Sequence, residues 1–139
     1  MQYKRIMCLD YGDVRIGIAF SDLLKTIASP FDTYTRKTLD QDLNYFCELA
    51  KKQEVDTVVI GLAYNMDGTS GERITLTKEF GSLLQQKLNL PVVYVDERLS
   101  SVEAEDILAE AHIPAIKRKG LIDKIAASII LQNYLNSKK

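Results

Sequence analysis

The chain is poor in the residue types that build several common kinds of site. It has no Trp, one His and two Cys among 139 residues. A lone His112 without Cys partners excludes a zinc centre, and no Cys–His arrangement for nucleophilic catalysis is present. Cys8 and Cys47 lie far apart in apolar patterns, which predicts buried free thiols and not a disulfide.

The sequence also lacks a long hydrophobic run and an excess of charge of one sign. No segment approaches the ~20 apolar residues of a membrane span, and the first residues lack the pattern of a signal peptide. The chain has 18 Lys and Arg against 19 Asp and Glu, a net charge of −1. We therefore expect a cytoplasmic protein that has no membrane partner and holds any polyanion by local basic patches.

What the sequence does contain is enough apolar material for one core. Hydrophobic residues make up 46% of the chain and charged residues 27%, which excludes a disordered chain. A length of 139 residues suits one domain, and no linker, repeat or low-complexity tract divides it. We expect a single domain over residues 1–139.

Hydrophobic patterning predicts five strands, at residues 4–10, 15–21, 27–35, 56–62 and 92–96. The first three have short connections, which favour an antiparallel meander. The last two alternate with helices, so they should be parallel. Pro30 favours an edge position for the third strand. The expected fold class is α/β, with a mixed five-stranded sheet flanked by helices.

Four segments have helical spacing of apolar residues. Thr38 with Gln41, and Ser100 with Glu103, are typical of helix-capping boxes. The expected apolar stripes are Leu39, Leu43, Phe46, Cys47 and Ala50, then Leu76, Phe80, Leu83, Leu84 and Leu88, then Ala104, Ile107, Leu108 and Ala111. Residues 116–120 are expected to form a basic loop before a last helix over 121–135.

Carboxylates stand at the ends of two expected strands and the start of the last helix. Asp10 ends the first strand, Asp96 and Glu97 end the fifth, and Asp123 shares a helical face with small apolar residues. Adjacent strand residues point to opposite faces, so only one of Asp96 and Glu97 can face Asp10. Turn formation at Asp10 and helix-dipole stabilisation by Asp123 are the structural alternatives.

Together these acids favour a site for Mg²⁺ or Mn²⁺, because hard divalent cations prefer oxygen ligands. A metal-free acid–base pair is the alternative. Basic residues lie near the acids in the sequence and are candidates for phosphate contacts: Arg15, Arg73, Arg98, Lys117, Arg118 and Lys119. Tyr11 and Tyr64 are candidates for stacking on bases. Ordinary solvated side chains are the alternative for each.

Four motifs carry a family resemblance over nearly the whole chain. They are LDYGDVRIGIAFSD, VVIGLAYNMDGTSGER, VYVDERLSS and KGLIDKIAASIILQNYL. In this order they resemble the YqgF family, a bacterial RNase H-like group described as Holliday-junction resolvases and as nucleases that mature the small-subunit rRNA precursor. One departure is Ala63, where the family commonly has Pro.

The resemblance implies an RNase H-like fold and a metal-dependent carboxylate site of Asp10, Glu97 and Asp123, with Arg15 as the family's strand-two arginine. The leading hypothesis is a metal-dependent endonuclease on structured nucleic acid that matures the 5′ end of the 16S rRNA precursor, with ribosomal precursor particles as a partner. A resolvase of branched DNA, a non-catalytic ribosome-assembly module and an actin-like phosphotransferase are the alternatives. A resolvase would be a homodimer and an rRNA nuclease can be a monomer.

Overall fold

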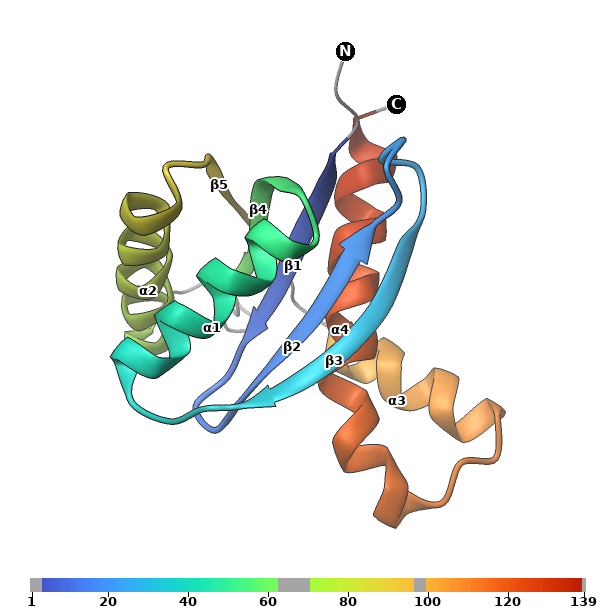
Figure 1. Cartoon of the computed structure of the whole chain (residues 1–139). Helices are drawn as coiled ribbons and strands as arrows, with labels where there is room; N and C mark the ends of the chain where they lie inside the picture. The colour runs from blue at the N-terminus through green and yellow to red at the C-terminus, as the bar shows by residue number, and fades with distance from the viewer. Residues whose placement is uncertain (1–3, 63–70, 97–99, 139) are drawn as a thin grey trace.

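The computed structural model describes residues 4–62, 71–96 and 100–138. Strands and helices follow one another in the expected order (Figure 1). They are β1 (Arg5–Tyr11), β2 (Arg15–Ser21), β3 (Ala28–Thr35), α1 (Leu39–Lys52), β4 (Val55–Leu62), α2 (Glu72–Leu88), β5 (Val92–Asp96), α3 (Ser100–Glu110) and α4 (Ala115–Ser137).

The strands form one sheet in the order β3-β2-β1-β4-β5. Antiparallel pairs join β1 to β2 and β2 to β3, and parallel pairs join β1 to β4 and β4 to β5. The predicted mixed sheet is therefore confirmed. Pro30 lies on β3, an edge strand of this sheet, where the missing N–H of proline breaks no ladder on the open side.

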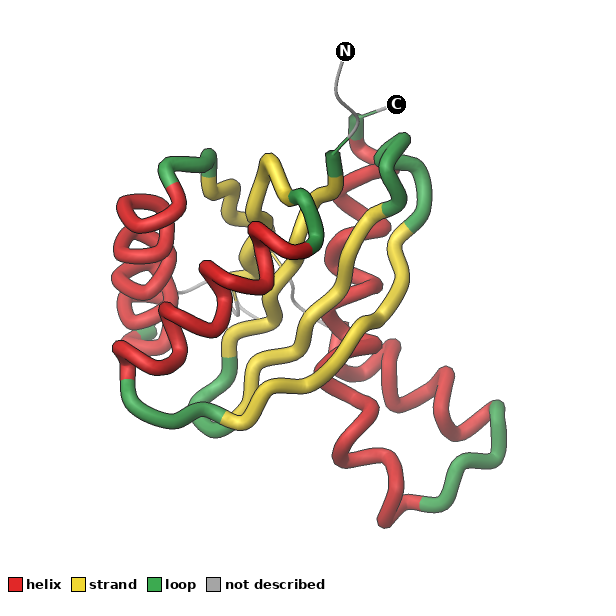
Figure 2. The backbone as a smooth tube through the Cα atoms, viewed as in Figure 1, coloured by secondary structure: helices red, strands yellow, loops and turns green. Residues whose placement is uncertain are grey.

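Helices cover both faces of the sheet (Figure 2). One face packs against α1 and α2 around Phe46 and Phe80, and the other packs against α4 around Ala127 and Leu131. The residues of β1 alternate between these two cores, as the period of two along a strand requires. Among the described residues, no helix is long and apolar enough to span a bilayer.

The predicted cap of the first helix is present. The Thr38 hydroxyl accepts from the Gln41 amide, and the Gln41 side chain accepts from the Thr38 amide. The side chain of Ser100 lies outside the described residues, so the second predicted box stays a prediction. Neither cysteine forms a disulfide, and Cys8 is buried as predicted, whereas Cys47 is only half-buried.

The apolar stripes are correct in their centres and wrong at some outer positions. Leu39 and Ile107 are exposed, and so are Leu76 and Leu83. In α2 the buried face is instead Ile74, Thr77, Phe80, Gly81 and Leu84. This buried face needs glycine at position 81, because the Tyr94 ring occupies the space that a Cβ there would need.

The predicted loop at residues 116–120 is wrong, because these residues form the start of α4. Pro114 precedes the helix with φ −57°, a backbone angle that suits a helix start. Asp123 therefore lies about two turns into the helix, beyond the reach of the dipole at its N-terminus. Helix-dipole stabilisation by Asp123, one of the sequence alternatives, is excluded.

Helix α4 crosses β2 with no side chain between the two backbones. A Cβ added to Gly17 would overlap the carbonyl oxygen of Asp123. On the neighbouring strand, the Thr33 hydroxyl donates to the Gly120 carbonyl at 3.2 Å. Because Gly17 pairs with Thr33, the two contacts lie side by side on neighbouring strands. Together they fix the distance of α4 above the sheet.

We predict that Gly17→Ala destabilises the fold by about 3 kcal/mol, because the new methyl group meets helix backbone that cannot rotate away. Gly120→Ala is the matched control, since a Cβ there has nothing within 4 Å and alanine favours a helix by up to about 1 kcal/mol. Urea unfolding of the two variants is the measurement. Equal loss in both would contradict the backbone contact.

Candidate functional site

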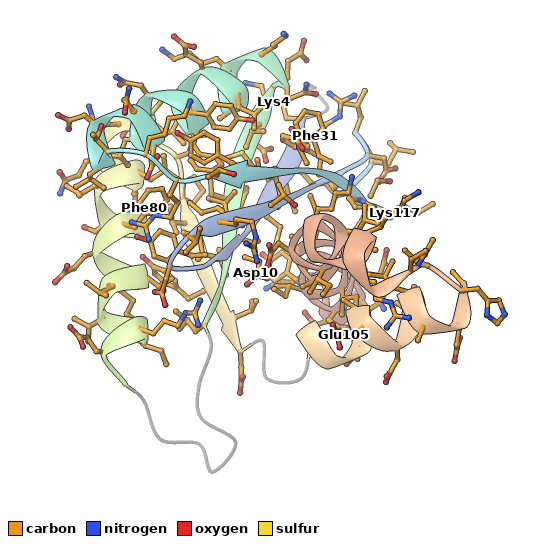
Figure 3. The ribbon with its side chains drawn as sticks, turned by 90° about the horizontal axis from the view of Figure 1, so that it is seen from below. Lys4, Asp10, Phe31, Phe80, Glu105 and Lys117 are labelled. Carbon is orange, nitrogen blue, oxygen red and sulfur yellow. The ribbon has the colours of Figure 1, made fainter. Side chains whose placement is uncertain are left out.

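Asp10 lies at the carboxyl end of β1, on the face covered by α4. Ile6 and Cys8 belong to the core under α4, and Asp10 follows them at the same period along the strand. Its partner across the β1–β2 ladder is Gly17. Asp10 is half-buried, and Figure 3 shows it where the strands meet the α4 ribbon.

Asp123 reaches the same place from the helix. Its backbone lies directly over Gly17, and the α-carbons of paired residues such as Gly17 and Asp10 are about 5 Å apart. Ala126 and Ala127, one turn further along the helix, are fully buried. Two of the predicted acids therefore come together on one face, at one edge of the sheet.

Arg15 forms an ion pair with Asp123. Its Nε donates to the Asp123 carboxylate at 2.7 Å, and the side chains of Arg15 and Asp123 are 38% and 23% exposed. A charge-assisted bond of this length orients the carboxylate, although partial exposure limits its effect on stability. The sequence placed Arg15 near the acids, but its described partner is a carboxylate of the protein.

Asp96 lies on the opposite face of the sheet from Asp10. On β5, Val93 and Val95 pack with the α4 core, whereas Val92 and Tyr94 pack with the α1 and α2 core. Alternation along the strand gives Asp96 the second face. Glu97 and Arg98 lie outside the described residues, and so does Tyr64.

The predicted basic patch divides into different environments. Lys117 is exposed, and Figure 3 shows it on the outer part of α4. Arg118 is half-buried, and its Nε donates to the Ile113 carbonyl at 2.8 Å, which ties the α3–α4 connection to the helix. The side chain of Lys119 lies outside the described residues.

Tyr11 does not present its ring to solvent. It is 6% exposed, and its ring centroid lies 4.8 Å from that of Phe80. Burial raises the pKa of its hydroxyl above the ordinary value, although the charge of Arg36 opposes that shift. The stacking role considered for Tyr11 is therefore wrong, because the ring is part of the core.

The sequence did not reveal that Arg36 holds the turn after Asp10. Its Nη1 donates to the carbonyl oxygens of Gly12 and Asp13 at 3.0 and 3.2 Å. The guanidinium also lies over the Tyr11 ring, 4.6 Å from its centroid. These contacts fix the turn that joins β1 to β2, directly after the catalytic candidate Asp10.

Asp42 anchors this arginine from inside the protein. It has no exposed surface, and one of its oxygens accepts from the Tyr34 hydroxyl and the Lys37 amide, both at 2.8 Å. The other oxygen faces Arg36 Nε at 3.5 Å, an ion pair without a closed hydrogen bond. Burial and the bond to Asp42 raise the pKa of Tyr34 to about 12.

One signal in the sequence could have revealed Asp42. It precedes Phe46 by four residues and Leu49 by seven, which places it on the apolar face of α1. A carboxylate on such a face needs a buried partner. The identity of that partner depends on the tertiary structure.

Carboxylates are the available metal ligands at this edge. Within the described residues, no group of three or more His, Cys, Asp or Glu is placed to hold an ion. The described part of the chain supplies Asp10 and Asp123, and the third predicted ligand is Glu97. Hard oxygen donors of this kind suit Mg²⁺ or Mn²⁺.

Comparison with known proteins gives a consistent family assignment. The family model described as RuvX, Holliday junction resolvase, matches residues 4–137. A protein of Halothermothrix orenii is 52% identical over 95% of this chain and 94% of its own, and one of Syntrophomonas wolfei is 49% identical over 95% and 94%. Both carry the provisional name of pre-16S rRNA nuclease.

Solved structures share the fold at low sequence identity. The RuvC of T. thermophilus in complex with a Holliday junction matches with a TM-score of 0.58 and 13% identity, over 97% of this chain and 95% of the other. The Fowlpox virus resolvase with junction DNA matches with a TM-score of 0.59 and 11% identity, over 96% and 98%. The RNase H-like fold class is confirmed.

We predict that Asp42→Asn lowers the free energy of unfolding by about 3 kcal/mol, because Arg36 then loses the buried charge that balances it. Asp40→Asn, on the exposed side of the same helix turn, should cost about 0.5 kcal/mol. Urea unfolding measures both.

Faster hydrogen exchange at the Gly12 amide, which bonds the Arg15 carbonyl at 3.0 Å, should accompany Asp42→Asn alone. Unchanged exchange there would show that the turn does not depend on Asp42.

Proposed function

Because this chain belongs to the RuvX family of Holliday junction resolvases, we propose that it is a nuclease that hydrolyses phosphodiester bonds of the 16S rRNA precursor. The observation that carries this proposal is the meeting of Asp10 and Asp123 over Gly17. An accessible pair of carboxylates at a strand end suits phosphodiester hydrolysis, and the described residues offer no Cys–His pair for other hydrolytic chemistry.

Asp10, Asp123 and Glu97 are proposed to hold one or two Mg²⁺ or Mn²⁺ ions. The pair of oxygen donors on one face supports this fit, and Asp96 faces away. Glu97 lies outside the described residues, and it is proposed as the third ligand because it stands in the VYVDERLSS motif that carries the family resemblance. When bound, such a cation supplies Lewis-acid activation of water and stabilises charge on the leaving oxygen.

The basic residues near this site position the acids and the nucleic-acid strand. Arg15 bonds the Asp123 carboxylate, and Arg36 bonds the turn next to Asp10. Lys117, Arg118, Lys119 and Arg98 are proposed to contact backbone phosphates, with Lys117 the exposed example among those described. Arg118 would contribute its charge while its Nε stays bonded to Ile113.

RNA is preferred as substrate because relatives with 49 and 52% identity over nearly their whole length carry the rRNA nuclease name. The site of action would then be the cytoplasm, on ribosomal precursor particles, and a monomer suffices. The second candidate is junction DNA, favoured by the family description and by resolvases of the same fold. That activity needs a homodimer, because two strands are cut symmetrically.

We predict that the purified protein with Mg²⁺ or Mn²⁺ cleaves a 16S rRNA precursor fragment at its 5′ flank, and that a four-way DNA junction stays intact. Asp10→Asn should reduce the rate at least about a hundredfold, because a ligand for charge stabilisation is lost. Gel analysis of end-labelled substrates is the measurement, and Asp40→Asn is the matched exposed control.

Symmetric cutting of the junction by a dimer would replace the RNA assignment with the resolvase. Equal cleavage by Asp10→Asn and the wild type would show that the carboxylate site is wrong. Binding of the RNA without cleavage, at any metal concentration, would favour the ribosome-assembly module.

We predict that Glu97→Gln abolishes cleavage, whereas Asp96→Asn retains at least about half of the wild-type rate. The reason is the alternation of β5, which directs Asp96 to the α1 and α2 side of the sheet. Titration of activity with Mn²⁺ separates lost affinity from lost chemistry. The reverse result would make Asp96 the ligand and place the strand end in a different register.

A further inference from the structure

Three arginine side chains approach the short turn between β1 and β2. Arg15 begins β2 and bonds Asp123. Arg36 bonds the turn carbonyls and faces Asp42. Arg73, from the first turn of α2, places Nη2 3.4 Å from the position that a Cβ on Gly12 would take. The turn after Asp10 is thus contacted by the guanidinium of Arg36 and approached by that of Arg73, while Arg15 begins the strand that follows it.

Arg73 differs from the other two in its partners. Arg15 and Arg36 each face a carboxylate, so their charges are balanced within the protein. Arg73 is exposed, and in the described part of the chain it forms no ion pair. Its positive charge therefore has no carboxylate partner among the described residues.

The distance from Arg73 to the carboxylate site is short. Gly12 is two residues beyond Asp10, and two residues of extended chain span at most about 7 Å. Arg36 bonds the carbonyl of Gly12 at 3.0 Å, which holds the turn that Arg73 approaches. A phosphate bound by Arg73 and a phosphate at the acids would therefore lie within the span of one nucleic-acid strand.

We propose that Arg73 binds a backbone phosphate of the nucleic-acid strand, in a nucleotide that flanks the bond being cut. This inference rests on the proposed nuclease function and extends its binding surface to α2. A guanidinium presents parallel N–H donors that match two oxygens of a phosphate. Phosphodiester backbones of RNA and DNA share this chemistry.

The position of Arg73 indicates how a bound nucleic-acid strand would run across the protein. Figure 3 shows α2 on one side of Asp10 and α4, with Lys117, on the other. A nucleic-acid strand that contacts Lys117 and Arg73 would pass Asp10 at the carboxyl end of β1. Contacts on both sides of the reacting phosphate restrict its movement, which favours in-line attack.

The test uses the full chain carrying Asp10→Asn, so that the strand stays intact while binding is measured. Into this chain we would introduce Arg73→Gln, Arg73→Lys or, as the control on the same helix, Lys78→Gln, which also replaces an exposed cation. Fluorescence anisotropy with a labelled precursor RNA and a labelled DNA junction gives Kd over a range of salt concentrations.

Arg73→Gln should weaken binding about tenfold at low salt. The slope of log K against log salt should fall by about 0.7 to 0.9, the value of one lost phosphate contact. Arg73→Lys should keep the slope and lose part of the affinity, because the charge stays but the two parallel N–H donors of the guanidinium are lost. Lys78→Gln should change Kd less than about twofold.

In the otherwise wild-type chain, Arg73→Gln should raise KM for the cleaved substrate with a smaller effect on kcat. If Arg73→Gln and Lys78→Gln give the same Kd and slope, Arg73 is an ordinary surface residue and the nuclease proposal stands. If the parent chain binds neither RNA nor DNA, the nuclease proposal and this inference both fail.

Discussion

The close contact between helix α4 and Gly17 is the constraint on which the candidate site depends. Only a residue without a Cβ leaves room for the Asp123 carbonyl above β2. The contact holds Asp123 over the strand pair that carries Asp10. A larger residue would lift the helix, and the two carboxylates would separate even if each element kept its own structure.

Charge is arranged around this contact in three different ways. Arg15 neutralises Asp123 at the surface, Arg36 is balanced by the buried Asp42 and holds the turn, and Arg73 is exposed. A chain with a net charge of −1 thus places positive groups beside its acidic edge. This local arrangement suits a polyanionic substrate better than the overall charge suggests.

Patterns within short segments predicted most of the fold. The antiparallel pairing of the first three strands followed from their short connections. The Thr38 box marked the start of α1 because its donors and acceptors are three residues apart. Errors arose where packing overrode local signals. Gly120 and three basic residues indicated a loop, but Pro114 and the packing of the two last helices make this segment helical.

The sequence by itself determined the sheet, the helices and the presence of acids at strand ends, because periodicity and turn chemistry act over a few residues. Tertiary structure decided which side chains meet. Arg15 and Asp123 are 108 residues apart, and the partner of the buried Asp42 is visible only when β3 and α1 are in place. The pair of Arg15 and Asp123 depends on the height of α4 above Gly17, which no local pattern encodes.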